Sequence, residues 1–419
     1  MGISGLWDVL KENGCMRRLE DFKEQNVFSN LKIAIDASIW IFEAFHQPAL
    51  AKMSVRERVA KVTFERVCEI LKLGALPVLV FDEKPPEAKG KSGSYGTGWA
   101  FLPQLIDLLS SIGVPTIRTG KRVGIDAECL CAYLNRENIV DVVISNDSDS
   151  LLYGARVVYK DCTFFPKPSA EIFSQEVIEE KTGLDRLGLI SFSLLTGSDF
   201  SDGVKQIGSR RALRIVSSIA SSTDITATTT FSSHRQLNNV MVTFLSPLSD
   251  EERRLCAINK CEKHCLRCGH RCSKQNHGPR GCKECGTHSK TRGGNGKGFC
   301  LETLESGSTV TCPCEFHVKA LERERARVKR SARSKRPNLE NEFETVIRTF
   351  LVRIPKVVRD KAQALNFQWW TRFEYDESKV GCFDILKNVL RRKSSENSFS
   401  ETLQRRLIPL KLEICVRYV

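Results

Sequence analysis

Short runs of aliphatic and β-branched residues recur along the first 160 residues, and each of three runs ends at aspartate. The runs lie at residues 32–35, 77–81 and 140–144. Runs of this kind are typical of buried strands in a parallel sheet. The aspartates that follow them are Asp36, Asp82, Asp147 and Asp149. Because parallel strands present their carboxyl ends at one edge of a sheet, we expect these carboxylates to lie together.

Segments with helical periodicity separate these strands. The predicted helices of the first half are residues 1–14, 38–45, 55–73, 101–112 and 129–135, with another short strand at 114–117. This alternation predicts an α/β fold with a parallel sheet and helices on both faces. From Ser174 the pattern becomes helical, and the helices predicted there are residues 176–182, 187–195, 209–216, 343–353 and 383–392. We expect a mobile linker at residues 217–233, which are rich in Ser and Thr.

Two explanations fit the aspartates. Each could cap the helix or turn that follows it, and Asp126 and Glu128, at the start of another helix, could interact favourably with that helix dipole. Alternatively, the carboxylates converge and repel one another, and a hard divalent cation such as Mg²⁺ relieves the repulsion. A cap explains a single aspartate well, whereas three strand ends at one edge favour the metal site.

The charge balance adds a candidate partner. The 419 residues include 64 Lys and Arg against 50 Asp and Glu, a net charge of +14. A basic protein with an acidic site is typical of an enzyme that binds a polyanion and places a metal ion at the bond to be cut. Solvated surface charge is the simpler explanation of the basic balance. No apolar run reaches the length of a membrane span, and no secretory signal is visible, so we expect no membrane partner.

A glycine-bounded loop, residues 203–208, leads into a basic helix that carries Arg210, Arg211 and Arg214. Backbone N–H groups and the positive end of a helix dipole suit a phosphate. Helix–turn–helix loops that bind no nucleic acid also contain glycine, so the pattern alone is moderate evidence.

Most of the seventeen cysteines lie between Cys256 and Cys314. Two CxxC pairs have the spacing of a structural zinc site, and their members are Cys265, Cys268, Cys282 and Cys285. A second site could use Cys300, Cys312, Cys314 and His317, while Cys272 and His277 are alternative ligands. Free cysteines in a loop are the remaining explanation.

Several motifs in this order resemble the XPG/flap-endonuclease superfamily of structure-specific nucleases. They are MGISGLW, AIDASIW, VFDEKPP, DAECLCAYLN, ISNDSDSLLYG and LLTGSDFSDGVKQIGSRRAL. Within the superfamily the chain is most similar to the eukaryotic Holliday-junction resolvase branch. The resemblance implies a PIN-like nuclease domain at residues 1–185 and a helical DNA-binding domain at 186–392. It also implies a cysteine-rich insert at 256–317 and a tail at 393–419, which we expect to be a truncated chromodomain or its remnant.

The resemblance also implies roles for individual residues. Seven acids would bind two Mg²⁺ ions, or Mn²⁺ in their place: Asp36, Asp82, Asp126, Glu128, Asp147, Asp149 and Asp199. Gly2 would lie beside the active site, and a helix–two-turn–helix motif at residues 203–211 would hold duplex phosphates, with K⁺ on its carbonyls. The implied DNA-binding residues are Gly2, Gly203, Lys205, Gly208, Arg210 and Arg211.

The implied function is hydrolysis of phosphodiester bonds near DNA branch points in the nucleus, in recombination and repair. Two copies would act on one four-way junction. A flap or bubble endonuclease and a non-catalytic DNA-binding scaffold are the alternatives. Asp126 and Glu83 stand where the family has Glu and Gly, and Gln206 replaces a loop glycine. Residues 87–100 are too few for the arch that threads single-stranded flaps, which favours junctions or bubbles.

Overall fold

A computed structural model describes residues 2–21, 27–47, 52–82, 102–111, 113–119, 125–164, 167–204, 207–221, 246–257, 315–335 and 339–365. The described chain forms two compact units. The first contains residues 16–175 and 351–365, and the second contains residues 2–15 and 176–350. The predicted domain limits at residues 185 and 392 remain a prediction. Among the described helices, none has the length and apolar character needed to span a bilayer.

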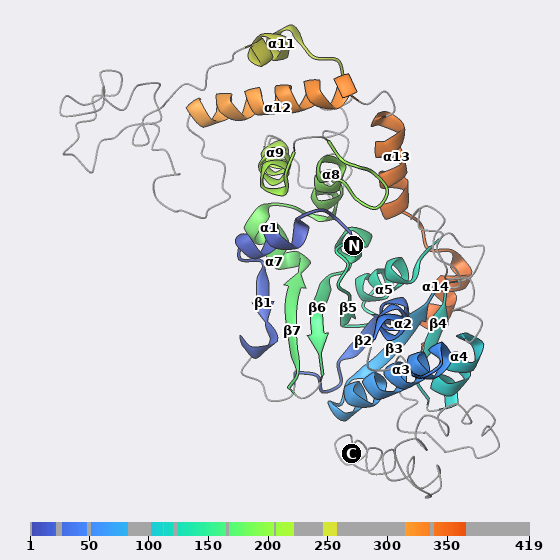
Figure 1. Ribbon diagram of the computed structural model, residues 1–419. Coiled ribbons are helices and arrows are strands. Elements are labelled where there is room, and N and C mark those ends of the chain that lie inside the picture. Colours follow the sequence, from blue (N-terminus) through green and yellow to red (C-terminus); the bar gives the residue numbers. More distant parts are fainter. Residues whose placement is uncertain are drawn as a thin grey trace, which may run out of the picture. The chain divides into compact units, whose positions relative to one another are not determined.

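The first unit is built on a seven-stranded sheet with the order β1-β7-β6-β5-β2-β3-β4 (Figure 1). The strands are β1 Met16–Arg18, β2 Lys32–Asp36, β3 Leu76–Phe81, β4 Thr116–Arg118, β5 Val142–Ile144, β6 Val157–Thr163 and β7 Ser169–Ser174. The predicted α/β fold is confirmed. The five strands from β6 to β4 are parallel, whereas β7 and β1 add an antiparallel edge that the sequence pattern did not predict.

The helices of this unit are α2 Ala37–His46, α3 Val55–Lys72, α4 Leu102–Ser111, α5 Ala127–Arg136, α6 Asp149–Tyr153 and α14 Lys356–Gln363. Helix α3 begins with a capping box, in which Ser54 and Glu57 satisfy each other's backbone N–H groups. The helices predicted at 38–45, 55–73, 101–112 and 129–135 are confirmed with shifts of one or two residues at most ends. Helices α6 and α14 were not predicted; they have five and eight residues, too few for a clear helical period.

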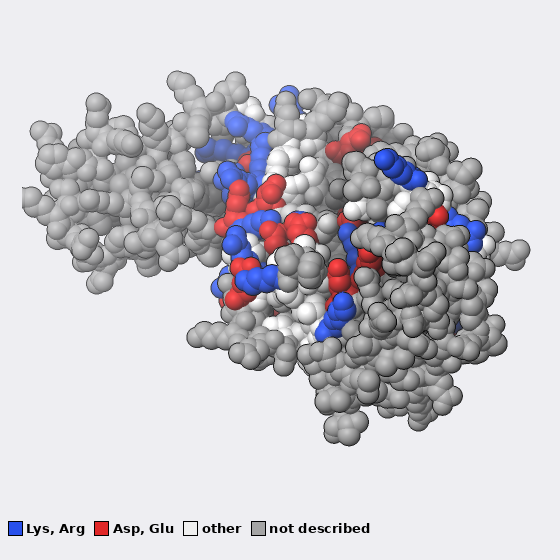
Figure 2. Space-filling view, turned by 60° about the horizontal axis from the view of Figure 1, so that its bottom comes forward, with Lys and Arg blue, Asp and Glu red and all other residues white. Residues whose placement is uncertain are grey.

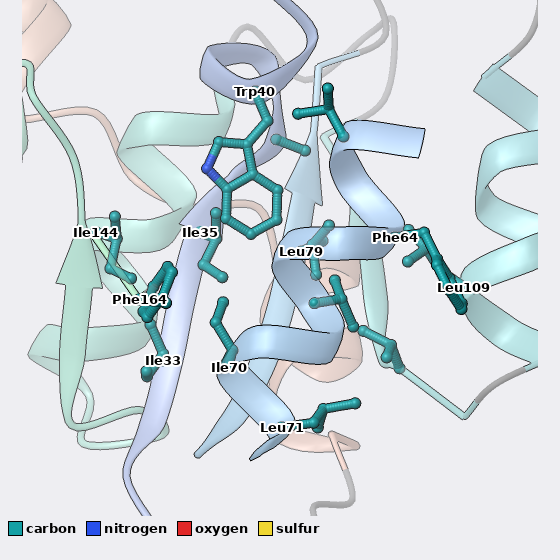
Figure 3. Close-up of a cluster of buried hydrophobic side chains, with 14 of the residues drawn as sticks. Ile33, Ile35, Trp40, Phe64, Ile70, Leu71, Leu79, Leu109, Ile144 and Phe164 are labelled. Atoms are coloured by element: carbon teal, nitrogen blue, oxygen red, sulfur yellow. The ribbon is translucent and has the colours of Figure 1, made fainter. Parts of the chain in front are cut away.

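One face of the sheet packs on α2, α3 and α4 through a cluster of buried side chains (Figure 3). Ile33 and Ile35 of β2 lie in this cluster with Trp40 of α2 and Ile70 of α3. Because side chains alternate along a strand, Ala34 between the two isoleucines points to the opposite face. There, α5 packs against β2, β3 and β5. The sheet is therefore covered on both faces, as predicted.

This alternation determines where the acids point. Asp36 follows Ala34 by two positions, Asp82 follows Val80, and Asp147 follows Val143 by four. Even spacing leaves Asp36 and Asp82 on the face of the sheet that α5 covers. Asp147 lies in the loop after β5, which ends at Ile144. Strand period and register thus direct the carboxylates of two neighbouring strands, β2 and β3, toward the start of α5.

The second unit is helical, as predicted, and includes the N-terminal segment. Its helices are α1 Leu6–Glu12, α7 Gln175–Thr182, α8 Arg186–Thr196, α9 Ser209–Ser221, α11 Asp250–Ala257, α12 Glu315–Lys335 and α13 Leu339–Phe350. Helix α8 is buried along most of its length and packs against α9 and α13. The ring of Phe200 meets Phe350 edge-on, and Arg186 donates to the Phe350 carbonyl at 2.6 Å.

Some expectations changed or lie outside the described residues. The linker predicted at 217–233 begins too early, because α9 continues to Ser221 through an apolar face that includes Ile215 and Val216. The loop at 87–100, the helix at 383–392 and the tail at 393–419 lie outside the described residues. So do nearly all residues of the cysteine-rich insert.

Asn135 joins three elements and yields a stability prediction. Its buried side-chain amide donates to the carbonyls of Val140 and Asp141 at 3.1 and 2.7 Å, and its oxygen accepts from the N–H groups of Arg156 and Val157 at 2.6 and 3.0 Å. Asn135→Ala leaves four buried or half-buried backbone groups unpaired. We expect it to lower the free energy of unfolding by about 3 kcal/mol or more.

The matched control is Asn146→Ala, which removes an exposed hydrogen bond to the N–H of Asp161. Chemical denaturation of the two variants measures the difference, and we expect the control to lose less than about 1 kcal/mol. Equal losses would contradict the structural role given to Asn135.

Candidate functional site

Two of the predicted acids stand at strand ends and are held by neighbouring backbone. Asp36 is the last residue of β2 and the N-cap of α2, where its Oδ1 accepts from the N–H of Ser38 at 2.8 Å. Asp82 follows β3; its Oδ1 accepts from the N–H of Ala127 at 2.6 Å and its Oδ2 from the Ser38 hydroxyl at 3.1 Å. Ser38 therefore hydrogen-bonds to both aspartates and fixes their spacing.

Helix α5 brings the next two acids. Asp126 is its N-cap and accepts from the N–H of Cys129 at 2.7 Å, while its other carboxylate oxygen accepts from the Tyr153 hydroxyl at 3.3 Å. Glu128 lies in the first turn and accepts from the Ser145 hydroxyl at 3.5 Å. The capping explanation is thus right for Asp36 and Asp126, and it operates together with clustering.

The loop after β5 supplies Asp147 and Asp149. The Ser145 hydroxyl accepts from the N–H of Asp147 at 3.0 Å, and Oδ1 of Asp147 accepts from the N–H of Asp149 at 3.1 Å. Asp149 begins α6 and is fully buried. One ligand atom from each of Glu128, Asp147 and Asp149 lies within 4.8 Å of the others, and all three residues are buried.

The electrostatics show that the strand-end acids belong to the same cluster. Burial raises the pKa of Asp82 well above its usual value, and the charges of Asp36 and Asp126 raise it further. The buried thiol of Cys131 also has a pKa well above normal. Burial is the main cause there, and four acids add to it: Asp36, Glu128, Asp82 and Asp126. Six of the seven predicted acids therefore lie in one unit and form a cluster rich in negative charge.

This donor set fits a hard divalent cation. Carboxylate oxygens are the ligands that Mg²⁺ and Mn²⁺ prefer, and a cation offsets the cost of burying several like charges together. Glu128, Asp147 and Asp149 are the residues placed closely enough to share one ion. The arrangement supports divalent-metal use.

Asp199 and Gly2 belong to the second unit. Asp199 is exposed in the turn after α8, where Ser198 and Ser201 form an isolated bridge. Gly2 has a positive φ of 88°. Their roles beside the acidic cluster remain predictions.

The predicted phosphate-binding segment lies in the second unit, with Lys205 and Gln206 outside the described residues. Gly203 has φ +66°, and a Cβ there would lie 2.3 Å from the backbone nitrogen of Gly197, so no larger residue fits. Gly208 has open space around it and directly precedes α9.

The arginines of α9 have carboxylate partners that sequence reasoning missed. Nε of Arg210 donates to Glu12 of α1 at 2.7 Å, and Arg211 forms an ion pair with Glu324 of α12. These partners are 198 and 113 residues away in sequence, so no local pattern could have identified them. On the face shown in Figure 2, the acidic and basic side chains of the described residues lie intermixed.

Comparison with known proteins agrees with this geometry. Residues 1–94 match the family model of the XPG N-terminal domain, and residues 123–199 match that of the XPG I-region. Over these two regions the chain belongs to the XPG family of nucleases. The two matched regions contain all seven acids of the prediction, which places the whole set within the superfamily's characteristic segments.

Two curated relatives in the superfamily illustrate the similarity. The chain is 26% identical over 402 residues to the human protein named Flap endonuclease GEN homolog 1, covering 88% of this chain and 40% of the relative. It is 29% identical over 316 residues to Flap endonuclease GEN-like 1 of Arabidopsis thaliana, covering 69% of this chain and 50% of that protein. The chain therefore spans half or less of the length of these relatives.

Among solved structures, the catalytic core of Rad2 in complex with DNA substrate aligns with a TM-score of 0.47 and 25% identity. The alignment covers 62% of this chain and 77% of the Rad2 chain.

The raised pKa of Asp82 predicts a pH effect in metal-free protein. Because the folded-state pKa lies above the unfolded value of about 3.9, the folded state binds more protons between the two values, so stability falls as pH rises through this window. We expect Asp82→Asn to be more stable than wild type at neutral pH in EDTA and to lose stability less steeply with pH.

Thermal unfolding at several pH values between about 4 and 8, above the unfolded pKa of about 3.9, measures this effect. The control is Asp360→Asn, an exposed position on α14 of the same unit, whose stability should vary with pH as that of wild type does. Identical pH profiles for wild type and Asp82→Asn would contradict the inferred repulsion.

The loop glycine gives a second prediction. Gly203→Ala forces a Cβ into the backbone of residues 196–197, whereas Gly183→Ala meets no atom within 4 Å at a similar φ of +70°. Both variants carry a left-handed strain of about 1–2 kcal/mol. Only Gly203→Ala adds a backbone clash, so we expect it to lose at least about 2 kcal/mol more than the control. Chemical denaturation measures both, and equal losses would refute the close approach.

Proposed function

We propose that this chain is a divalent-metal-dependent, structure-specific DNA endonuclease that hydrolyses phosphodiester bonds near branch points. The observation that carries the proposal is the convergence of Asp36, Asp82 and Asp126 with the buried triad of Glu128, Asp147 and Asp149. Carboxylates alone would repel a phosphodiester, so the cluster has a catalytic use only with bound cations.

Each acid has a defined task in this proposal. Glu128, Asp147 and Asp149 would hold one cation, and Asp36, Asp82 and Asp126 would supply further carboxylate ligands. Bound divalent cations would activate water and stabilise the leaving oxygen. The caps and serine hydroxyls keep the carboxylates oriented, because each aspartate of β2 and β3 is fixed through at least one oxygen. Asp199 is proposed as a further ligand.

DNA would be held by the helical unit. The backbone around Gly203 and Gly208 and the positive end of α9 suit a duplex phosphate, with Gly2, Lys205, Arg210 and Arg211 contributing as the resemblance implies. K⁺ on the loop carbonyls belongs to the same proposal. Zinc bound by Cys265, Cys268, Cys282 and Cys285 would order the insert without taking part in the cut, and fewer than one zinc per purified chain would refute it.

Resolution of four-way junctions is the reaction we favour, with two copies on one junction and action in the nucleus. The GEN-named relatives and the resolvase-like motifs support this choice. The names of these relatives also contain the words flap endonuclease, so a flap substrate is the second candidate. Intact four-way, nicked and flap substrates separate the two: symmetrical paired cuts on the intact junction support resolution, and exclusive cleavage of flaps contradicts it.

The catalytic role predicts a selective loss in Asp147→Asn. This substitution removes one negative charge from the triad and changes the shape of the site little. Loss of even an outer-shell partner of a metal ligand lowers metal affinity or activity about 10–100-fold. We expect cleavage of a four-way junction in Mg²⁺ to fall more than about 100-fold. Binding measured in Ca²⁺ should remain within a few-fold of wild type.

The control is Asp107→Asn, an exposed change on α4, which should cut at the wild-type rate. Cleavage by Asp147→Asn at the wild-type rate would defeat the catalytic assignment. A wild-type protein that binds branched DNA and cuts none in Mg²⁺ or Mn²⁺ would indicate the scaffold alternative.

A further inference from the structure

Helix α12 carries a row of cations that the proposed site does not use. We define the basic stripe as Lys319, Arg323, Arg327 and Arg330. At 100° per residue, these positions fall within about 80° of arc on one side of the helix. Lys319, Arg327 and Arg330 are exposed, and Arg323 is half-buried between them. Glu322 and Glu324 flank the stripe, three residues from Lys319 and Arg327 respectively.

One edge of α12 is fixed by α9. The carboxylate of Glu324 forms ion pairs with Arg211 and with Arg214, which lies one turn further along α9. Helix α9 directly follows the predicted phosphate-binding loop. Both Glu324 and Arg211 are half-buried, so this contact is partly shielded from water. The pairing ties α12 to the helix proposed to hold DNA phosphate.

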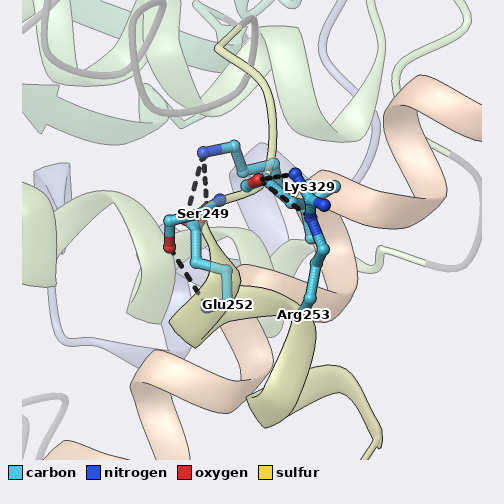
Figure 4. Close-up of polar contacts among 5 residues, drawn as sticks. Ser249, Glu252, Arg253 and Lys329 are labelled. Carbon is cyan, nitrogen blue, oxygen red and sulfur yellow. Dashed lines mark hydrogen bonds and ion pairs between the residues drawn. The ribbon is translucent and has the colours of Figure 1, made fainter.

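The other edge is fixed by α11, as Figure 4 shows. Nζ of Lys329 lies 3.0 and 2.9 Å from the two carboxylate oxygens of Glu252, and the Lys329 side chain is only 5% exposed. Glu252 is itself held by the backbone N–H of Ser249 at 2.7 Å and donates its own N–H to the Ser249 hydroxyl at 3.1 Å. This capping box at the start of α11 keeps the carboxylate in place.

These two edges determine which way the stripe points. Glu324 and Lys329 are five residues apart, which separates them by about 140° around the helix. The residues in that arc are half-buried or buried, as Leu321, Arg325 and Val328 show. The centre of the basic stripe lies about 170° from the centre of this packed arc. Lys319, Arg327 and Arg330 are exposed on the side away from this arc, whereas Arg323 is half-buried and Ala326, next to Lys319 around the helix, is buried.

We propose that the basic stripe of α12 is a second contact surface for the DNA backbone, beyond the loop and helix α9; the inference rests on the proposed function. Lys319 and Arg330 are eleven residues apart, so the stripe is about 17 Å long. That length matches about half a turn of duplex DNA, whose turn is 34–36 Å. The three exposed cations, Lys319, Arg327 and Arg330, complement a regularly spaced row of phosphates, and this contact carries no sequence specificity.

The test uses the full chain with Lys319, Arg327 and Arg330 all changed to Gln. Glutamine is a good helix former, so the helix should persist, and circular dichroism checks this. The matched control changes Arg56, Lys72 and Lys361 to Gln, which removes the same charge from exposed positions on α3 and α14 of the other unit. Binding to a synthetic four-way junction is measured in Ca²⁺ across a range of KCl concentrations.

Each phosphate contact contributes about 0.9 to the slope of log affinity against log salt. We expect the stripe variant to lose up to about 2.7 from this slope and at least about tenfold in affinity at moderate salt. The control should keep the wild-type slope. Equal slopes for the stripe variant and wild type would overturn this inference, and equal losses in both variants would assign the effect to net charge and overturn it as well. Failure of the wild-type chain to bind the junction would instead refute the proposed function.

Discussion

Repulsion among carboxylates at the carboxyl edge of the sheet is the constraint on which the structure of this chain depends. Strand period directs Asp36 and Asp82 to one side. The start of α5 adds Asp126 and Glu128, and the loop after β5 adds Asp147. Burial of like charges is costly without compensation. Part of the compensation is built in, because backbone N–H groups and serine hydroxyls donate to these acids. A bound cation supplies the rest and, in the proposed nuclease, makes the cluster useful.

The remainder of the first unit serves to hold that edge rigid. The cluster around Trp40, Ile70 and Leu79 fastens α2 and α3 to the face of the sheet away from α5. Asn135 joins α5 to the chain that enters β5 and β6, which fixes the start of the acidic loop. Rigid support matters because a metal site loosened by an ångström loses function before it loses its fold.

Much of this could be predicted from the sequence, because the signals are local. Strands of uniform hydrophobicity ending at aspartate predicted β2, β3 and β5, and helical periodicity predicted α3 and α4. The antiparallel edge could not be predicted this way, because β7 (SAEIFS) interleaves Ala170, Ile172 and Phe173 with polar residues and lacks the continuous aliphatic run of β2 and β3. The supporting hydroxyls of Ser38, Ser145 and Tyr153, and the partners Glu12 and Glu324, act across long sequence separations that leave no periodic trace.

The most direct test of the central claim is to locate a metal ion in the protein. Crystals of the chain soaked in Mn²⁺ allow the ion to be found by anomalous scattering. The account predicts a strong peak bounded by the carboxylates of Glu128, Asp147 and Asp149, and no such peak there in crystals of Asp147→Asn prepared in the same way. A wild-type crystal with these carboxylates ordered and no peak among them, at Mn²⁺ concentrations that support DNA cleavage, would contradict it.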